Sequence, residues 1–310
     1  MRTPRTRISQ LGASGLALAL LAVTACSSAS TSATVDGNVI TRDDLSGVRA
    51  TYEEEAAMPG DRVRDDLTGL IIEEALAGAA EENYGLTFSD EAIAERSANP
   101  PPRYADVFSA LASDPAAGER LVASNARISL VRDGVVPELL LERYGSYETV
   151  LVEAPDLVVQ ACVRHLLTAT AEEATAALVR IQEGEDFAAV AAEVSLDTSS
   201  PEGVLGGEAC PLAVGQVGRD FATAVADAPL GEANGPVQTQ FGFHIIQVEE
   251  RTLPSVAELE ADPMTYLDPS EVSGMFTPWF NEAVRAADID VRSSVGTWSE
   301  AVVGISPPGP

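Results

Sequence analysis

A change of hydrophobic pattern near Pro155 divides this chain of 310 residues into two kinds of structure. Upstream of Pro155, apolar residues recur at helical spacing, as in Val63, Leu67, Leu70, Ile71 and Ala75. Downstream, short segments typical of strands, such as 163–167 and 243–248, alternate with amphipathic stretches, which predicts strands and helices in one module. The pattern therefore predicts an α+β protein in which a mainly helical part flanks a mixed module.

The helical part is predicted from turn and capping residues. Residues 35–40 should form a tight hairpin around Asp36-Gly37-Asn38, and Thr41 should cap a helix that runs to about Glu55. Further helices are expected after the break at 58–60 up to Gly85, from the cap Ser89 to about Arg96, over 103–113 and over 116–144. Pro137 should kink or divide the last of these. A final helix is expected around Trp279.

The mixed module is predicted over residues 155–251. A strand should cover 157–167, followed by a helix over 172–183 that Gly184 ends and a second helix that Asp186 caps. A loop over 195–207, a short helix around Phe221 and two strands, at 235–237 and 243–248, should complete it.

The N-terminus has the three parts of a signal peptide. Three arginines (Arg2, Arg5 and Arg7) precede an apolar run over 16–23, which is too short to cross a hydrocarbon core of about 30 Å. Val23-Thr24-Ala25-Cys26 resembles the bacterial lipobox, which implies cleavage before Cys26 and acylation of its sulfur. We therefore expect an extracytoplasmic protein anchored in the cell membrane by lipid. The alternative is an ordinary signal peptide that leaves a free cysteine.

Charge and composition exclude some partners. The chain has 19 basic residues, all of them arginine, against 48 acidic ones, and its net charge is −29. Such a body repels phosphate backbones, so nucleic-acid binding is not expected. Three cysteines and two histidines are too few for a multi-ligand structural zinc site, and neither a metal nor a cofactor is expected.

Seven motifs, in order over residues 156–251, resemble the parvulin family of peptidyl-prolyl isomerases. They are Arg164-His165-Leu166-Leu167, Gly184-Glu185-Asp186-Phe187, Ser195-Leu196-Asp197-Thr198-Ser199-Ser200, Gly206-Gly207-Glu208, Gly215-Gln216-Val217, Gly235-Pro236-Val237 and Gly242-Phe243-His244-Ile245-Ile246. The resemblance implies a parvulin-like (FKBP-like) fold and isomerisation of X-Pro bonds. This reaction needs no nucleophile: a pocket that binds the twisted amide more tightly than the planar one lowers the barrier of about 18–20 kcal/mol.

The resemblance also implies the site residues. Both histidines of the chain, His165 and His244, fall at the family's paired-histidine positions, and Asp197 falls where parvulins place a Cys or Asp. This trio is the implied catalytic set, with the proline ring bound by Leu212, Val217, Phe221 and Phe241. The chain departs from the family at Ala209 and Leu212, where parvulins carry a leucine and an aromatic residue, which implies a wider or shallower pocket.

The flanking helices resemble those of SurA- and PrsA-type foldases over residues 34–97, which implies a parvulin module inserted in a helical chaperone domain. The expected division is a signal peptide (1–25), a tether (26–34), a helical domain (35–154), the isomerase domain (155–251), a helix that completes the helical domain (252–295) and a tail (296–310). The implied partners are unfolded or partly folded exported proteins with X-Pro bonds. Two alternatives stay open, a catalytically weak holdase or a generic helical bundle, while a metal site on the two distant histidines is disfavoured.

Two cysteines remain if Cys26 is acylated, in a compartment that permits oxidation. Cys162 lies three residues before His165 on the same predicted strand, so its side chain should point away from the histidine face. We predict a disulfide between Cys162 and Cys210, with two separate buried thiols as the alternative.

Overall fold

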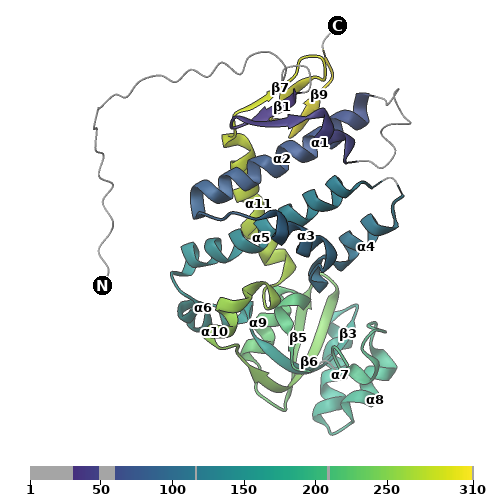
Figure 1. Ribbon diagram of the computed structural model, residues 1–310. Helices are drawn as coiled ribbons and strands as arrows, with labels where there is room; N and C mark the ends of the chain where they lie inside the picture. The colour runs from purple at the N-terminus through teal and green to yellow at the C-terminus, as the bar shows by residue number, and fades with distance from the viewer. Residues whose placement is uncertain (1–30, 49–59, 116, 208–209, 309–310) are drawn as a thin grey trace.

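The computed structural model of the chain describes residues 31–48, 60–115, 117–207 and 210–308. The predicted signal peptide, Cys26 and Ala209 lie outside these residues. The first helix, expected to run to about Glu55, is shorter than predicted: it ends at Ser46, where Gly47 forms the C-cap and donates its N–H to Asp43 O. The described chain consists of a helical part with a small sheet at its end and a mixed module (Figure 1).

Strands from both ends of the described chain meet in one sheet. Its order is β2 (Asn38–Thr41), β1 (Thr31–Val35) and β7 (Ile289–Val291), with both pairs antiparallel. The predicted hairpin at 35–40 is confirmed, and Asp36 and Gly37 take φ angles of 49° and 85°. The expectation of a tether up to residue 34 is wrong for 31–34, because strand pairing with β2 and β7 orders these residues.

Most of the predicted helices are present. They are α1 (Arg42–Ser46), α2 (Gly60–Tyr84), α3 (Asp90–Ala98), α4 (Ala105–Ser113), α5 (Glu119–Tyr144) and α11 (Pro269–Ala286). A further short helix that was not predicted, α6 (Tyr147–Glu153), follows α5. Thr41 and Ser89 cap α1 and α3 as expected. Pro137 does not divide α5, because buried residues on both sides of it, Val135, Val136 and Leu140, hold the helix in the core. None of the helices within the described residues is long and apolar enough to span a membrane.

Segments distant in the sequence share the core of the helical part. Helix α11 packs against α2 and α5, and Leu70, Val135 and Val284 belong to one buried cluster. Residues 296–310, expected to be a tail, contain a hairpin of β8 (Thr297–Ser299) and β9 (Gly304–Ser306). Trp298 and Ile305 face each other in this hairpin and pack on the same cluster, which explains its order.

The mixed module is an antiparallel sheet with helices on both faces. The strand order is β4 (Leu212–Ala213), β3 (Gln160–Thr168), β6 (Gly242–Thr252) and β5 (Ala233–Thr239). Leu166 and Ile245 face α7 (Ala171–Gln182) and α8 (Phe187–Val194), whereas Val163 and Ile246 face α9 (Arg219–Asp227). Helix α10 (Val256–Ala261) leads back to α11. The predicted α+β fold class, with a mixed module and a mainly helical part on either side of it in sequence, is confirmed.

Candidate active site

The two histidines lie side by side on the α9 face of the sheet. His165 of β3 is opposite Ile246, and His244 of β6 is opposite Leu167, so the two side chains are diagonal neighbours on adjacent strands. Their Nδ1 atoms are 3.4 Å apart, and the rings stack with centroids 5.7 Å apart. Both are buried, with exposed fractions of 4% and 3%.

Asp197 reaches His165 from the loop after α8. Its Oδ2 lies 2.8 Å from His165 Nε2. The loop is tied to β3 because Leu196 N–H donates to Leu167 O (2.7 Å), and Ser195 Oγ accepts from the N–H groups of Leu167 and Asp197. The structure therefore brings together all three predicted catalytic residues.

Two further residues complete the network, and sequence analysis assigned neither. Ser200 Oγ lies 3.0 Å from His165 Nε2, and Thr239 Oγ1 lies 2.8 Å from His244 Nε2. The position of each in the sequence could have indicated that it lies near the histidines. Ser200 follows Asp197 in a serine-rich loop, and Thr239 lies across the tight β5–β6 turn from His244, where hairpin pairing places it nearby.

The pKa values indicate an ionised aspartate beside two neutral histidines. Burial raises the pKa of Asp197, but hydrogen bonds from Ser199 and Ser200 and the charge of His165 outweigh it and lower the pKa to about 2. Burial lowers the pKa of His165, against the attraction of Asp197. Burial and repulsion by His165 lower the pKa of His244 to about 4.

These protonation states determine which ring nitrogen of each histidine carries the hydrogen. An ionised Asp197 only accepts, so His165 carries its hydrogen on Nε2 and leaves Nδ1 as an acceptor. His244 must then donate from its own Nδ1 and accept at Nε2 from the hydroxyl of Thr239, which in turn accepts from Phe241 N–H at 3.1 Å. The hydrogen bonds run in one direction, from the β5–β6 turn to Asp197. Asp197 Oδ1 also accepts from Ser199, so both carboxylate oxygens are engaged and neither is poised as a nucleophile.

An apolar wall lies against the histidines. The ring of Phe221 is 0% exposed and meets His165 and His244 edge-on, with centroids 5.9 and 5.4 Å away. Leu212 and Val217 are half-buried and pack on the same cluster, as does Leu205, which sequence analysis did not assign. The structure does not bring the fourth predicted substrate residue there: Phe241 lies at the exposed β5–β6 turn with 61% of its surface accessible, and only its backbone joins the network.

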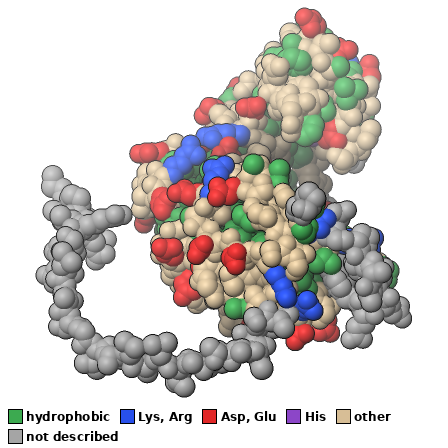
Figure 2. All heavy atoms as spheres, turned by 90° about the horizontal axis from the view of Figure 1, so that it is seen from above, with side chains coloured by type: hydrophobic (Ala, Val, Ile, Leu, Met, Phe, Trp, Pro, Cys, Tyr) green, Lys and Arg blue, Asp and Glu red, His purple; other side chains and the backbone are tan. Residues whose placement is uncertain are grey.

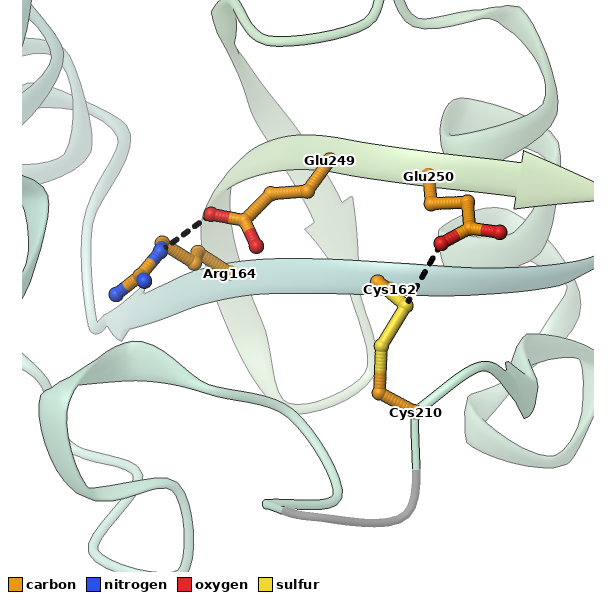
Figure 3. The surroundings of a disulfide bond; sticks show 5 residues. All are labelled: Cys162, Arg164, Cys210, Glu249 and Glu250. Atoms are coloured by element: carbon orange, nitrogen blue, oxygen red, sulfur yellow. Dashed lines mark hydrogen bonds and ion pairs between the residues drawn. A yellow bond between two sulfur atoms is a disulfide. The ribbon is translucent and has the colours of Figure 1, made fainter.

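The structure joins Cys162 and Cys210 by a disulfide, with Cα atoms 5.2 Å apart (Figure 3). Cys162 is on β3, on the sheet face opposite His165. Nearby, Arg164 pairs with Glu249 at 2.6 Å, and Glu250 lies beside Cys162. The bridge therefore ties the segment after the Asp197 loop to the strand that carries His165.

Protonation of His244 should switch the network off at low pH. The pKa of His244 in the folded protein is about 4, against an ordinary value of 6.5, so the neutral network is already formed at pH 6 and is lost as the pH falls through 4. The stability that this lowered pKa contributes is complete above pH 6.5. A protonated Nε2 can no longer accept from Thr239, and the chain of hydrogen bonds breaks. We expect the heteronuclear NMR spectrum of the imidazole nitrogens to report neutral His244 at pH 6 and protonation near pH 4. An ordinary titration midpoint near 6.5 would contradict the assignment.

Comparisons with known proteins agree with this geometry. Residues 161–250 match the family described as the PPIC-type PPIase (rotamase) domain. Foldase protein PrsA of Caldanaerobacter subterraneus subsp. tengcongensis is 33% identical over 126 residues, which cover 41% of this chain and 40% of that protein. Foldase protein PrsA 2 of Listeria monocytogenes is 28% identical over 214 residues, which cover 62% of this chain and 69% of that protein.

The chain is also similar to a chaperone and to a protein of known structure. Chaperone SurA of Cupriavidus metallidurans is 30% identical over 191 residues, covering 55% of this chain and 38% of that protein. A crystal structure of the peptidylprolyl isomerase PrsA from Bacillus anthracis aligns with a TM-score of 0.45 at 19% identity, over 70% of this chain and 96% of that one. The chain spans less than half the length of two of these curated relatives.

Proposed function

We propose that this chain, which carries a PPIC-type PPIase domain and is homologous to the PrsA and SurA foldases, catalyses the cis–trans isomerisation of X-Pro bonds in exported proteins. The observation that carries the proposal is the neutral His165–His244 pair, held by Asp197 and Thr239 against the ring of Phe221. The expected residue types occur together at one face of the sheet.

The proposed mechanism is preferential binding of the twisted amide. Rotation about the X-Pro bond removes conjugation, so the transition state is less polar at oxygen and has a pyramidal nitrogen. Phe221 would form the buried floor of the proline site, and half-buried Leu212 and Val217 its accessible walls. Neutral histidines would keep charge out of this pocket and hold its shape. The departures at Ala209 and Leu212 would lower the rate by widening the pocket.

The helical part would bind unfolded or partly folded clients. We retain the division into a helical domain (35–154, completed by 252–295) around an isomerase domain (155–251) as part of this proposal. Its support is the homology to proteins named foldase and chaperone, and the shared core of α2, α5 and α11. The same homology supports an extracytoplasmic location.

Lipid anchoring through Cys26 follows from the Val23-Thr24-Ala25-Cys26 motif. Wild-type protein expressed in a bacterium fed an alkyne-tagged fatty acid should take up the label and fractionate with membranes. Cys26→Ala should lose the label and either leave the membrane fraction or keep its leader. Cys162→Ala, which leaves Cys26 in place, is the matched control and should keep the label. Equal labelling of Cys26→Ala and wild type would refute the anchor.

A holdase with a weak isomerase is the second candidate, favoured by the Leu212 departure. Two assays separate the candidates: isomerisation of an Ala-Pro tetrapeptide, and suppression of aggregation of a reduced client protein without proline-limited folding. An isomerase accelerates the first reaction at catalytic concentration. A holdase acts only on the second, at near-equimolar amounts.

A further inference from the structure

A cavity in the helical part of this acidic protein is lined by two arginines and, among the described residues, by no carboxylate. It measures about 470 Å³ and lies between the 3₁₀ turn Pro102–Tyr104, α5, the 3₁₀ turn Pro263–Thr265 and the start of α11. Its walls are mainly apolar, with Met264, Leu267 and Val272 prominent, and the chain returning from the mixed module builds one side.

The charged residues that line this cavity are all arginines. Arg103 and Arg132 face it, and no carboxylate lines it. Three further cavities formed by described residues each include at least one carboxylate, such as Glu73, Glu173 or Glu282. The contrast is large for a chain with 48 acidic residues and 19 arginines, and Figure 2 shows acidic side chains spread over the face it presents.

The two arginines differ in their partners. Arg103 is neutralised by Asp133 at 2.7 Å and by Asp262 at 3.3 Å. Arg132 stacks over the ring of Phe276 at 5.7 Å and donates to Ser273 Oγ at 3.2 Å. Within the part of the chain that the structure describes, Arg132 has no ion-pair partner, and its buried Nε has no hydrogen-bond partner.

An arginine held in this way is suited to an incoming carboxylate. Stacking on Phe276 fixes the plane of the guanidinium, so little side-chain entropy is lost when a carboxylate binds. Such charge-assisted hydrogen bonds are shorter and stronger than neutral ones. The apolar walls beside it would accept a large hydrophobic side chain next to the acidic group.

We propose that this cavity binds an extended client segment in which an Asp or Glu neighbours a large apolar residue, with the carboxylate on Arg132. The inference rests on the proposed client binding by the helical part and adds its sequence preference. An arginine left without a carboxylate would let an acidic protein hold acidic segments that its surface otherwise repels.

The test uses end-blocked, fluorescein-labelled peptides that carry Leu-Glu-Phe, Leu-Gln-Phe or Leu-Lys-Phe in a Gly/Ser background. Fluorescence anisotropy with the purified protein should give a Kd about tenfold lower for the Glu peptide than for the Gln peptide, and the Lys peptide should bind most weakly. Arg132→Gln should remove the preference, and Arg132→Glu should reverse it toward Lys. Arg143→Gln is the matched control. Arg143 is also in α5 and also stacks on an aromatic ring, that of Tyr144, but it lies outside the cavity, so this variant should keep the preference.

A second measurement uses wild-type protein alone, so its result does not depend on whether the variants fold. In wild-type protein, the Glu-over-Gln preference should shrink as salt is raised from 0.05 to about 1 M, because screening weakens an accessible charge pair. Equal binding of Glu and Gln peptides by wild type, or an unchanged preference in folded Arg132→Gln, would overturn the proposal while client binding stands. Failure to bind any peptide would overturn both, and the tetrapeptide assay tests isomerisation separately. A Gln peptide that gains affinity only with a free C-terminus would assign the site to terminal carboxylates and also contradict it.

Discussion

Replacing Cys162 and Cys210 together by alanine should lower the free energy of unfolding of the mixed module by about 4 kcal/mol. The bridged residues are 48 positions apart, and the bond restricts the unfolded chain by closing this long loop. The loop contains α7, α8 and the Asp197 segment, so its release also loosens the tie between the Asp197 loop region and β3.

Two probes separate the stability of the mixed module from that of the helical part. Both tryptophans, Trp279 and Trp298, pack on the helical core, so tryptophan fluorescence reports that part alone. Amide hydrogen exchange read on β3 and β6 peptides reports the module. The double variant should exchange faster in these strands by a factor that corresponds to the lost free energy, while the urea midpoint of the fluorescence transition stays close to that of wild type.

Reduction provides the control. Wild-type protein treated with a phosphine reductant should show the same faster exchange, and the double variant should not respond to reductant. Unchanged exchange of β3 and β6 after complete reduction, verified by alkylation and mass, would show that the bridge contributes nothing to the module.

Local sequence signals predicted much of this fold. Thr41 and Ser89 cap helices where expected because a capping side chain needs only the next three residues. The Asp36-Gly37 turn and the period-two pattern around His165 are equally local. The family resemblance then placed His165, His244 and Asp197 together, although strand β6 lies far from β3 in sequence.

Other features depend on distant contacts, which single-sequence patterns do not report. Residues 31–34 look like a polar linker, but Ala33 and Thr34 pair with Val291 and Asp290 of β7. Trp298 looks like part of a tail but packs on the core. Pro137 is tolerated in α5 because burial outweighs one lost hydrogen bond. The family resemblance placed Phe241 in the proline site, yet its side chain is exposed at the turn and is not part of the Phe221 cluster.

The histidine pair gives the second large expected effect. His165→Ala and His244→Ala should each lower kcat/KM for an Ala-Pro tetrapeptide by about 100-fold, because each breaks the directed network and removes one hydrogen-bond partner of a polar group beside the pocket. The partner is Asp197 in the first variant and Thr239 in the second. The double variant should lose little more than either single variant, since the two act as one unit.

The control is Arg164→Gln. Arg164 is next to His165 in sequence but points to the opposite face of β3, where it pairs with Glu249 (Figure 3). This variant should keep wild-type kcat/KM, which shows that a change on β3 is not harmful in itself. Circular dichroism and the intact disulfide mass verify that all variants are folded.

The most direct test of the account is therefore the isomerisation rate of an Ala-Pro tetrapeptide with wild type, His165→Ala, His244→Ala and Arg164→Gln at pH 7. We predict catalysis by wild type and Arg164→Gln and a loss of about 100-fold in each folded histidine variant. Full activity in both histidine variants, or no catalysis by wild type, would contradict it.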